Sequence, residues 1–440
     1  MMRVLGPRFK WILVLEALFA GVYTSLTRGL FVVYLVSVGY AVEGISFVVM
    51  ASSASSTLLG AFLYRRPTFI MRRPKIKLIF FHTFERITWI LISLVSHTLF
   101  ISILYSAYMI SSSLISTLIA FTIYGSLEEE EIRDVTGKRS AASGVSSVLG
   151  YALGAFLLGL LPPYEKFSYI FPLGAIIGLI STLLVSLLDL SHLEEASSPG
   201  RVEQPERIFS TSSFFMVFLA SGNFGGIVWT PYVMNRLGGP DFIPALMSLF
   251  GSISSITASL FWKGRSFTAL RMGLLLNALG PLLIWMTPSP VLHIPINVYT
   301  SFTYTAGNFI GSFLFARYKE WFGAVKSSVL LGLIGSIAQL VASPLGMLVG
   351  GDYLLGFTVM FALKALANLL AFLTIPEVAV VSEDVARTYS RILYSSSLTS
   401  YQFAFEISKE TILTILRLII FSAVIVMLYI IYRVLWMLMI

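Results

Sequence analysis

The chain of 440 residues contains no cysteine, and only 12% of its residues are charged. Without cysteine there is no disulfide framework, no thiolate metal site and no redox chemistry at sulfur. A soluble domain carries roughly 25% charged residues, so this composition excludes an ordinary soluble enzyme or binding domain. The mean hydropathy of +0.86 and the hydrophobic share of 57% indicate an integral membrane protein made mostly of helices.

Motifs for catalysis and for nucleotide binding are also missing. The sequence has no Walker loop, no Gly-x-Ser-x-Gly motif and no acidic pair on an ordered loop. The histidines are too scattered for a zinc site. We therefore expect no enzyme activity, no catalytic residues, no metal and no cofactor. The net charge of +8 does not predict nucleic-acid binding, because the basic residues lie in short loops beside apolar runs.

Long apolar runs fill most of the chain, and each is continuous over about 20 residues, which predicts membrane-spanning helices. We expect six spans in the first half, at about 11–38, 43–64, 77–97, 98–124, 140–161 and 167–189. Six more follow in the second half, at about 209–235, 242–262, 267–287, 291–316, 325–349 and 353–375. A thirteenth apolar run, at about 411–432, is expected to span as well, with a membrane-surface helix as the alternative.

Within the first 375 residues, the longest polar gap between the spans runs from Leu190 to Arg207 and is rich in Glu, Ser and Pro, which is typical of a linker. The outer loops hold only Lys166 and Arg236, whereas the other connecting segments are rich in Lys and Arg. The positive-inside rule therefore puts the N-terminus, the linker and the tail in the cytoplasm. We expect the protein to lie in the plasma (cell) membrane.

The two halves repeat each other in a pattern of small residues at helical spacing. Ser53, Thr57, Gly60 and Tyr64 correspond to Gly251, Ser255, Ala258 and Trp262 at one constant offset. A second pattern, Ser143, Ser147, Gly150 and Gly154, parallels Ser328, Gly332, Gly335 and Gln339. Stripes of this kind allow helix backbones to approach closely, and ordinary packing could explain either one alone. Their presence in matching helices favours an internal repeat.

Six plus six helices, a cytoplasmic middle loop and parallel halves resemble the major facilitator superfamily, over about residues 10–375. The loop after the second span has the family's Gly, at Gly60, and its basic cluster, but Tyr64 stands near the family's Asp. The loop from Ser126, SLEEEEIRDVTGKRSAASG, is similar to the family's acidic stretch followed by basic and small residues. The resemblance makes Gly60, Arg65, Arg66 and Arg139 candidate gating residues of the cytoplasmic loops.

The resemblance implies an all-α membrane protein of two six-helix bundles related by pseudo-symmetry. The expected parts are residues 1–190 and 209–375 for the bundles, 191–208 for the cytoplasmic linker, and 376–440 for a cytoplasmic tail segment with the extra helix. In such a fold the first, fourth, seventh and tenth helices line a central cavity. We expect a monomer whose partners are the lipid bilayer and a small solute.

Arg28 is the sharpest candidate site residue because it lies inside the first span, where a charge is costly. Facing a cavity, its guanidinium could pair with an anionic group of a solute. It could also reach the outer surface or pair with Glu43. Polar stripes on the expected cavity helices add further candidates, with bonds between helices as the alternative role: Tyr23, Ser25, Tyr105, Tyr108, Ser112, Asn223, Trp229, Asn297, Tyr304, Asn308 and, on the eleventh helix, Gln339.

Two acidic residues within the spans are candidates for proton coupling. Glu16 could take up a proton on one side of the membrane and release it on the other, since burial raises the pKa of a carboxyl group. The alternative for Glu16 is an ion pair with Lys10 or another basic residue of the inner loops. Glu85 is the second candidate; the alternative is that Glu85, like Arg86 and Lys364, belongs to a structural pair or points at another helix.

These patterns predict a secondary active or facilitative transporter that moves a small solute by alternating access, with its site between the two bundles. The alternative is a non-transporting membrane protein, either a lipid-modifying enzyme or a transporter-like sensor or scaffold. A lipid enzyme should place acids or histidines at the membrane surface. The run Glu128 to Glu131 is the only dense candidate, and we interpret it as the solvated face of a loop.

Overall fold

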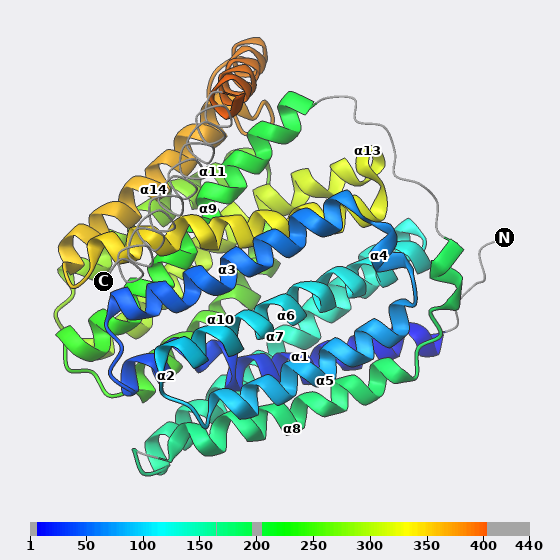
Figure 1. The fold of residues 1–440 in the computed structure, drawn as a ribbon. Coiled ribbons are helices and arrows are strands. Elements are labelled where there is room, and N and C mark those ends of the chain that lie inside the picture. The colour runs from blue at the N-terminus through cyan, green and yellow to red at the C-terminus, as the bar shows by residue number, and fades with distance from the viewer. Residues whose placement is uncertain (1–6, 164, 196–204, 403–440) are drawn as a thin grey trace, which may run out of the picture.

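The computed structural model describes residues 7–163, 165–195 and 205–402 of the chain (Figure 1). Its regular structure is helical throughout these residues. Ten of the described helices are long and apolar enough to cross a membrane. The predicted thirteenth span at 411–432 and the middle of the predicted linker lie outside the described residues.

The six predicted spans of the first half pack as one bundle. Helix α1 packs mainly against α7 and α8, and α6 packs against α3 and α5. In chain order the elements are α1 (Pro7–Leu26), η1 (Arg28–Leu30), α2 (Phe31–Ser37), α3 (Val42–Arg65), α4 (Thr68–Met71), α5 (Pro74–Ile92), α6 (Thr98–Ser126), α7 (Glu129–Leu160), α8 (Lys166–Ser186) and η2 (Ser191–Glu195).

The helices of the second half also pack against one another. The elements of this half are α9 (Pro205–Pro231), a π-helical turn η3 (Tyr232–Arg236), α10 (Phe242–Trp262), α11 (Phe267–Ala278), α12 (Gly280–Met286), η4 (Pro290–Leu292), α13 (His293–Val349) and α14 (Tyr353–Thr374). After α14 the backbone is again helical from residue 383 to residue 402. This tail helix is tied to the start of α9, where the hydroxyls of Ser390 and Ser210 are 2.7 Å apart.

Helix α13 covers both the tenth and the eleventh predicted spans, and its two parts run in opposite directions (Figure 1). The first part runs parallel to α10, since Asn297 bonds to Met247 and Trp262 bonds to Phe302. The second part runs antiparallel to α3, with Leu333 beside Gly60 and Gly346 beside Ser46. The chain therefore crosses the bundle twice within this one helical element.

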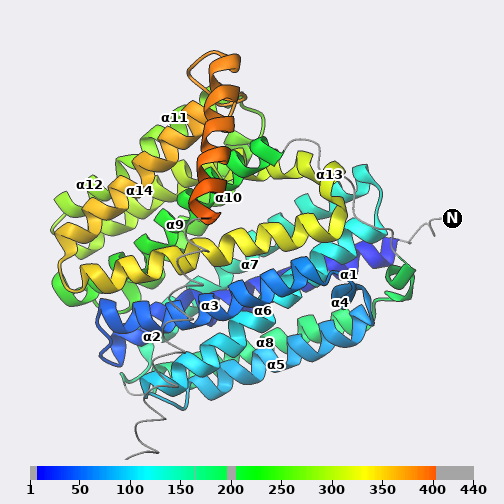
Figure 2. The same cartoon turned by 45° about the horizontal axis from the view of Figure 1, so that its top comes forward.

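The bundles meet most extensively at one end. We call the end with α4 the linker end and the opposite end the far end. Near the far end one hydrophobic core contains residues of both halves, from Phe31 and Tyr34 to Tyr232 and Phe357. Near the linker end each half has its own core, although Val329 of the second half joins the core of the first. The helices of the second bundle accordingly diverge from α5 and α8 toward the linker end (Figures 1 and 2).

Polar contacts also join the bundles at the far end. Lys166, at the start of α8, forms an ion pair of 2.6 Å with Asp241, which precedes α10. A Cβ atom on Gly350 would lie 2.7 Å from the Glu43 carboxylate, so the two halves touch there as well. The seam between α3 and α13 continues to the linker end, where the Lys326 amine lies 5.6 Å from the Tyr64 ring centroid. The described conformation is thus closed at the far end.

Two predicted features need correction. The acidic run is the N-cap and first turn of α7 rather than a loop, and the Glu128 and Glu131 side chains form a capping box. Carboxylates are favoured there because they satisfy free backbone N–H groups and complement the helix dipole. The first span is not one continuous helix, since the α-helix stops at Leu26 and resumes at Phe31.

Candidate functional site

The break in the first membrane helix presents Arg28. Thr27 leaves the helical conformation, with φ −107° and ψ −90°, and Arg28 begins a short 3₁₀ turn. The side chain of Arg28 is exposed although it lies well inside the span Pro7–Ser37. Thr24, one helical turn earlier, is exposed too. The stripe Thr24–Arg28 therefore remains accessible in the first bundle.

Tyrosine side chains surround the Arg28 guanidinium. Tyr105 and Tyr108 on α6 and Tyr151 on α7 all lie within electrostatic reach of it. The rings of Tyr105 and Tyr108 stack at 5.4 Å, and Phe31 stacks on Tyr105 at 4.0 Å. A phenol hydroxyl both donates and accepts hydrogen bonds. Arg28 is the exposed member of this group, whereas Phe31, Tyr105 and Tyr108 are buried behind it and Tyr151 is half-buried.

The nearby carboxylate does not form an ion pair with Arg28, because it is already paired with another arginine. Glu85 lies within electrostatic reach of Arg28. However, its Oε2 atom is 2.5 Å from Nη1 of Arg86, and both side chains are buried. Among the residues that the structure describes, Arg28 forms no ion pair. One carboxylate thus faces two guanidinium groups, which leaves an excess positive charge at Arg28.

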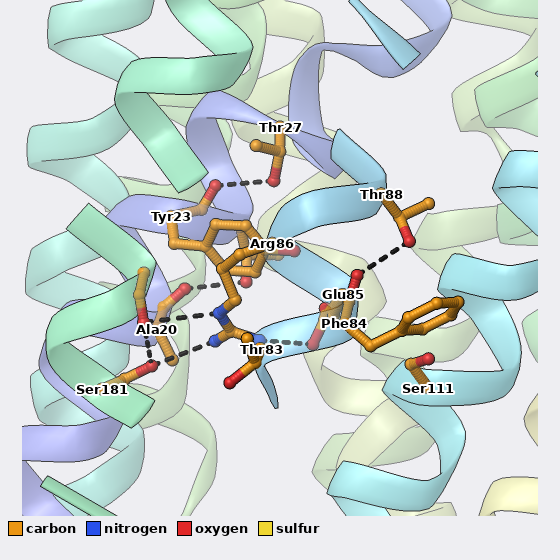
Figure 3. A network of polar contacts seen from close by, with 12 residues as sticks. Ala20, Tyr23, Thr27, Thr83, Phe84, Glu85, Arg86, Thr88, Ser111 and Ser181 are labelled. Atoms are coloured by element: carbon orange, nitrogen blue, oxygen red, sulfur yellow. Dashed lines mark hydrogen bonds and ion pairs between the residues drawn. The ribbon is translucent and has the colours of Figure 1, made fainter. Parts of the chain in front are cut away.

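Further contacts of Arg86 hold the Glu85–Arg86 ion pair in place (Figure 3). Arg86 donates to Ser181 Oγ at 3.0 Å and to the Gly178 carbonyl at 3.3 Å, both on α8. Its guanidinium also lies 4.3 Å from the ring centroid of Tyr23. Tyr23 is consequently buried between α1, α5 and α8, away from the exposed stripe. Arg86 is committed to contacts within the first bundle.

The remaining predicted residues of the first bundle lie close to Arg28 or support it. Ser25 is buried and donates to the Gly21 carbonyl at 2.9 Å, where α1 packs on α7. Ser112 is half-buried one turn beyond Tyr108. Tyr151 was not among the predicted residues. Gly29 accommodates this tyrosine, since a Cβ there would collide with the Tyr151 hydroxyl.

The second bundle brings some of its predicted residues to open space and commits others to packing. On α9, Asn223 is half-buried, and nothing lies within 4 Å of a Cβ placed on Gly226, one turn further. Asn308 and Gln339, both on α13, are half-buried. Tyr304 stacks on Phe218 at 4.5 Å.

Trp229 and Asn297 hold the second bundle together. The Trp229 indole donates to Nδ1 of His293 at 2.9 Å, and the Asn297 amide donates to the Met247 carbonyl at 2.5 Å. Both bonds link different helices, which is the alternative role weighed for these polar stripes. Their donor groups are already occupied in this conformation.

The candidate coupling and gating residues lie nearer the linker end, apart from Glu85. Glu16 is buried and pairs with Arg139 at 2.6 Å, and Arg139 also donates to the Leu13 carbonyl. Gly60 is buried against Leu333 of the other bundle. Arg65 and Arg66 are exposed at the end of α3. Within the described part of the chain, no three His, Asp or Glu side chains come together to hold a metal ion.

Comparison with known proteins supports this architecture. No family model matches the sequence, and no curated protein matches it. Solved structures do match the fold. A mutant of the nucleoside transporter NupG aligns with TM-score 0.62 and 14% identity, covering 82% of this chain and 97% of that one. A bacterial homologue of the human lysosomal transporter Spinster, in an inward-facing and occupied conformation, gives TM-score 0.61 and 11% identity, covering 82% and 95%.

The proton:xylose symporter XylE, of the major facilitator superfamily, aligns with TM-score 0.58 and 13% identity, covering 87% of this chain and 98% of that one. All three are transporters or homologues of a transporter. The chain therefore has the fold of major facilitator superfamily transporters, as the sequence resemblance predicted.

Proposed function

We propose that the protein is a secondary transporter that moves a small anionic or polar solute, bound at Arg28, by alternating access of the two bundles. The observation that carries this proposal is the exposed Arg28 inside a membrane helix, without an ion-pair partner among the described residues. A membrane-embedded arginine is costly unless a partner compensates it. A solute with a carboxylate or phosphate group would supply that partner during each transport cycle.

The surroundings of Arg28 favour a particular kind of solute. A guanidinium can bind a carboxylate or phosphate through two parallel hydrogen bonds. The hydroxyls of Tyr105, Tyr108 and Tyr151 can bond to further polar groups of the solute. The stacked rings of Phe31 and Tyr105 are buried, so they support the Arg28 region from behind and do not form a surface that a solute could touch. We therefore propose a compact solute with one anionic end and further polar groups.

The proposed cycle begins from a state closed at the far end. Release there requires separation of the shared core and of the Lys166–Asp241 ion pair. Closure at the linker end requires the separate cores to approach each other. We infer from the Lys and Arg distribution that the linker end faces the cytoplasm, and we propose the plasma membrane as the location. The described state would then be inward-facing.

The source of energy would be an ion or solute gradient, since no nucleotide-binding motif occurs in the sequence. Glu16 and Glu85 are the proposed proton carriers if coupling exists. Each is held in an ion pair, with Arg139 and with Arg86 respectively. Protonation of either carboxyl would break its pair and free an arginine, so coupling through them would also change the packing of the first bundle.

A binding screen tests the proposed site. The purified protein is heated with a panel of monocarboxylates, phosphate monoesters, neutral sugars and nucleosides, and the solutes that raise its melting temperature are recorded. We expect anionic solutes among the hits. Arg28→Gln should weaken their binding by about 2–5 kcal/mol, because a hydrogen-bonded charge pair is lost. Arg28→Lys keeps the positive charge but lacks the two parallel donors of the guanidinium, so it should weaken binding less than Arg28→Gln does.

A matched variant separates a local effect from a general loss of charge. Arg8 lies at the exposed start of α1 and carries the same charge within the same membrane span. Arg8→Gln should leave the affinity unchanged. Hits whose affinity is identical in wild type and Arg28→Gln would contradict the proposed role of Arg28. An absence of hits across the panel would favour a transporter-like sensor or scaffold.

A further inference from the structure

A basic hollow lies at the linker end, between the end of α3 and the start of α5. It has a volume of about 1110 Å³. We call it the α3–α5 hollow. Its cationic lining consists of Arg65, Arg66, Arg72, Arg73 and Lys77, and no acidic residue of the described part of the chain lines it. Such a concentration of one charge sign is unfavourable unless anions compensate it.

The loop that forms the hollow is built around Lys77. The Lys77 amine donates to the Phe69 carbonyl and, at 2.5 Å, to the Arg72 carbonyl. It also lies 4.1 Å from the ring centroid of Phe69. Arg73 adopts the left-handed conformation, with φ 50° and ψ 56°, immediately before α5. These contacts hold the loop around α4 in shape, so the Lys77 amine stabilises the loop and is already occupied by its carbonyl groups.

Three arginines of the α3–α5 hollow are available to a ligand, namely Arg65, Arg66 and Arg72. All three are exposed, and among the described residues none of them forms an ion pair. In the equivalent loop of the second bundle, by contrast, only Lys263 and Arg265 are present, and Arg265 lies over the Phe261 ring at 4.6 Å. The loop that forms the α3–α5 hollow is therefore more strongly basic than the equivalent loop of the second bundle.

The hollow also has apolar walls that continue onto a membrane helix. Leu58 and Phe62 line it and are 73% and 49% exposed, respectively. Both belong to α3, which is apolar and long enough to cross the membrane. A ligand that fills this hollow therefore meets arginines at one end and hydrocarbon surface at the other. A membrane phospholipid has this combination of an anionic headgroup and an acyl chain.

We propose that the α3–α5 hollow binds an anionic phospholipid from the linker-end leaflet. Arg65, Arg66 and Arg72 contact the headgroup phosphate, and an acyl chain lies along Leu58 and Phe62. A guanidinium suits this role because its fork matches phosphate oxygens. The bound lipid would also lie close to Gly60, where α3 packs against Leu333 of the opposite bundle. The proposal is independent of the transported solute.

Native mass spectrometry of the detergent-purified chain tests this proposal. The probes are dioleoyl phosphatidylglycerol, dioleoyl phosphatidylcholine and soluble glycerol phosphate. We expect phosphatidylglycerol to bind more tightly than phosphatidylcholine. Each arginine near an anionic headgroup contributes about fivefold in affinity, so the double variant Arg66→Gln, Arg72→Gln should bind phosphatidylglycerol about 25-fold more weakly.

Two further variants sharpen the test. Lys263→Gln with Arg265→Gln removes the same charge from the equivalent loop and should leave the affinity for phosphatidylglycerol unchanged. Arg66→Lys with Arg72→Lys keeps the charge and should retain most of the binding. Equal binding of the two lipids, or an equal loss in the Lys263 and Arg265 variant, would overturn the proposal. Displacement of phosphatidylglycerol by an equal concentration of glycerol phosphate would assign the hollow to soluble phosphates instead.

Discussion

A disulfide between positions 46 and 346 should hold the far end closed. Ser46 lies on α3 and Gly346 on the second part of α13, so the bond would join the two bundles. A Cβ on Gly346 would lie 3.3 Å from the Cβ of Ser46. Disulfides have Cβ separations of about 3.5–4.5 Å, so a shift of a few tenths of an ångström suffices. Because the chain has no cysteine, the introduced pair cannot form a different disulfide within the molecule.

The magnitude follows from the long loop that the bond would close. With about 300 residues between the two positions, the chain-entropy model gives about 5–6 kcal/mol of stabilisation against unfolding. The oxidised Ser46→Cys, Gly346→Cys protein should therefore melt at a higher temperature than the reduced one. Transport should fall to background on oxidation and return on reduction. The assay is counterflow, in proteoliposomes, of a solute identified in the binding screen.

A bridge within one bundle is the matched control. A Cβ on Gly280 would lie 4.0 Å from the Cβ of Thr300, and both residues belong to the second bundle. Gly280→Cys with Thr300→Cys should form a disulfide without stopping transport. Full transport by the oxidised 46–346 protein, with the bond verified by thiol titration, would refute the inference that the far end opens by separation of α3 from α13.

Three further predictions concern buried charge and open space. Glu85→Gln leaves Arg86 buried without its carboxylate, so the free energy of unfolding should fall by about 3–5 kcal/mol. Thermal unfolding in detergent measures this change. An unchanged melting temperature would contradict the Glu85–Arg86 pairing. Lys364 is buried and donates to Asn277 Oδ1, so its removal leaves no carboxylate unpaired. Lys364→Met should therefore change the free energy of unfolding by less than about 1.5 kcal/mol in the same assay. Gly226→Trp should leave the fold intact, because open space surrounds Gly226, yet weaken solute binding at least about tenfold in titration calorimetry; normal binding would place the site elsewhere.

The helices could be predicted from the sequence because apolar runs of membrane length allow few other structures. The predicted second, fourth and eighth spans agree with α3, α6 and α10 to within a few residues. The break before Arg28 could not be predicted, because no proline marks it in the sequence. The start of α7 was missed for another reason: charged residues look like a loop unless helix capping is considered.

The candidate site was predictable only in part. Helical spacing put Tyr105 and Tyr108 on one face of the fourth span, and the structure brings both to Arg28. Spacing alone could not tell which polar face of a helix meets the other bundle. Tyr23 faces Arg86 inside the first bundle, and Trp229 is bonded to His293 inside the second. Tyr151 was missed because its role depends on the close approach of η1 and α7 at Gly29.

Counterflow in proteoliposomes tests the central claim most directly. Vesicles containing the wild-type protein are loaded with an unlabelled anionic solute from the binding screen, and uptake of the same radiolabelled solute is followed. The account predicts transient accumulation with wild type, none with Arg28→Gln, and normal accumulation with Arg8→Gln. Equal accumulation with wild type and Arg28→Gln, or none with wild type for any bound solute, would contradict it.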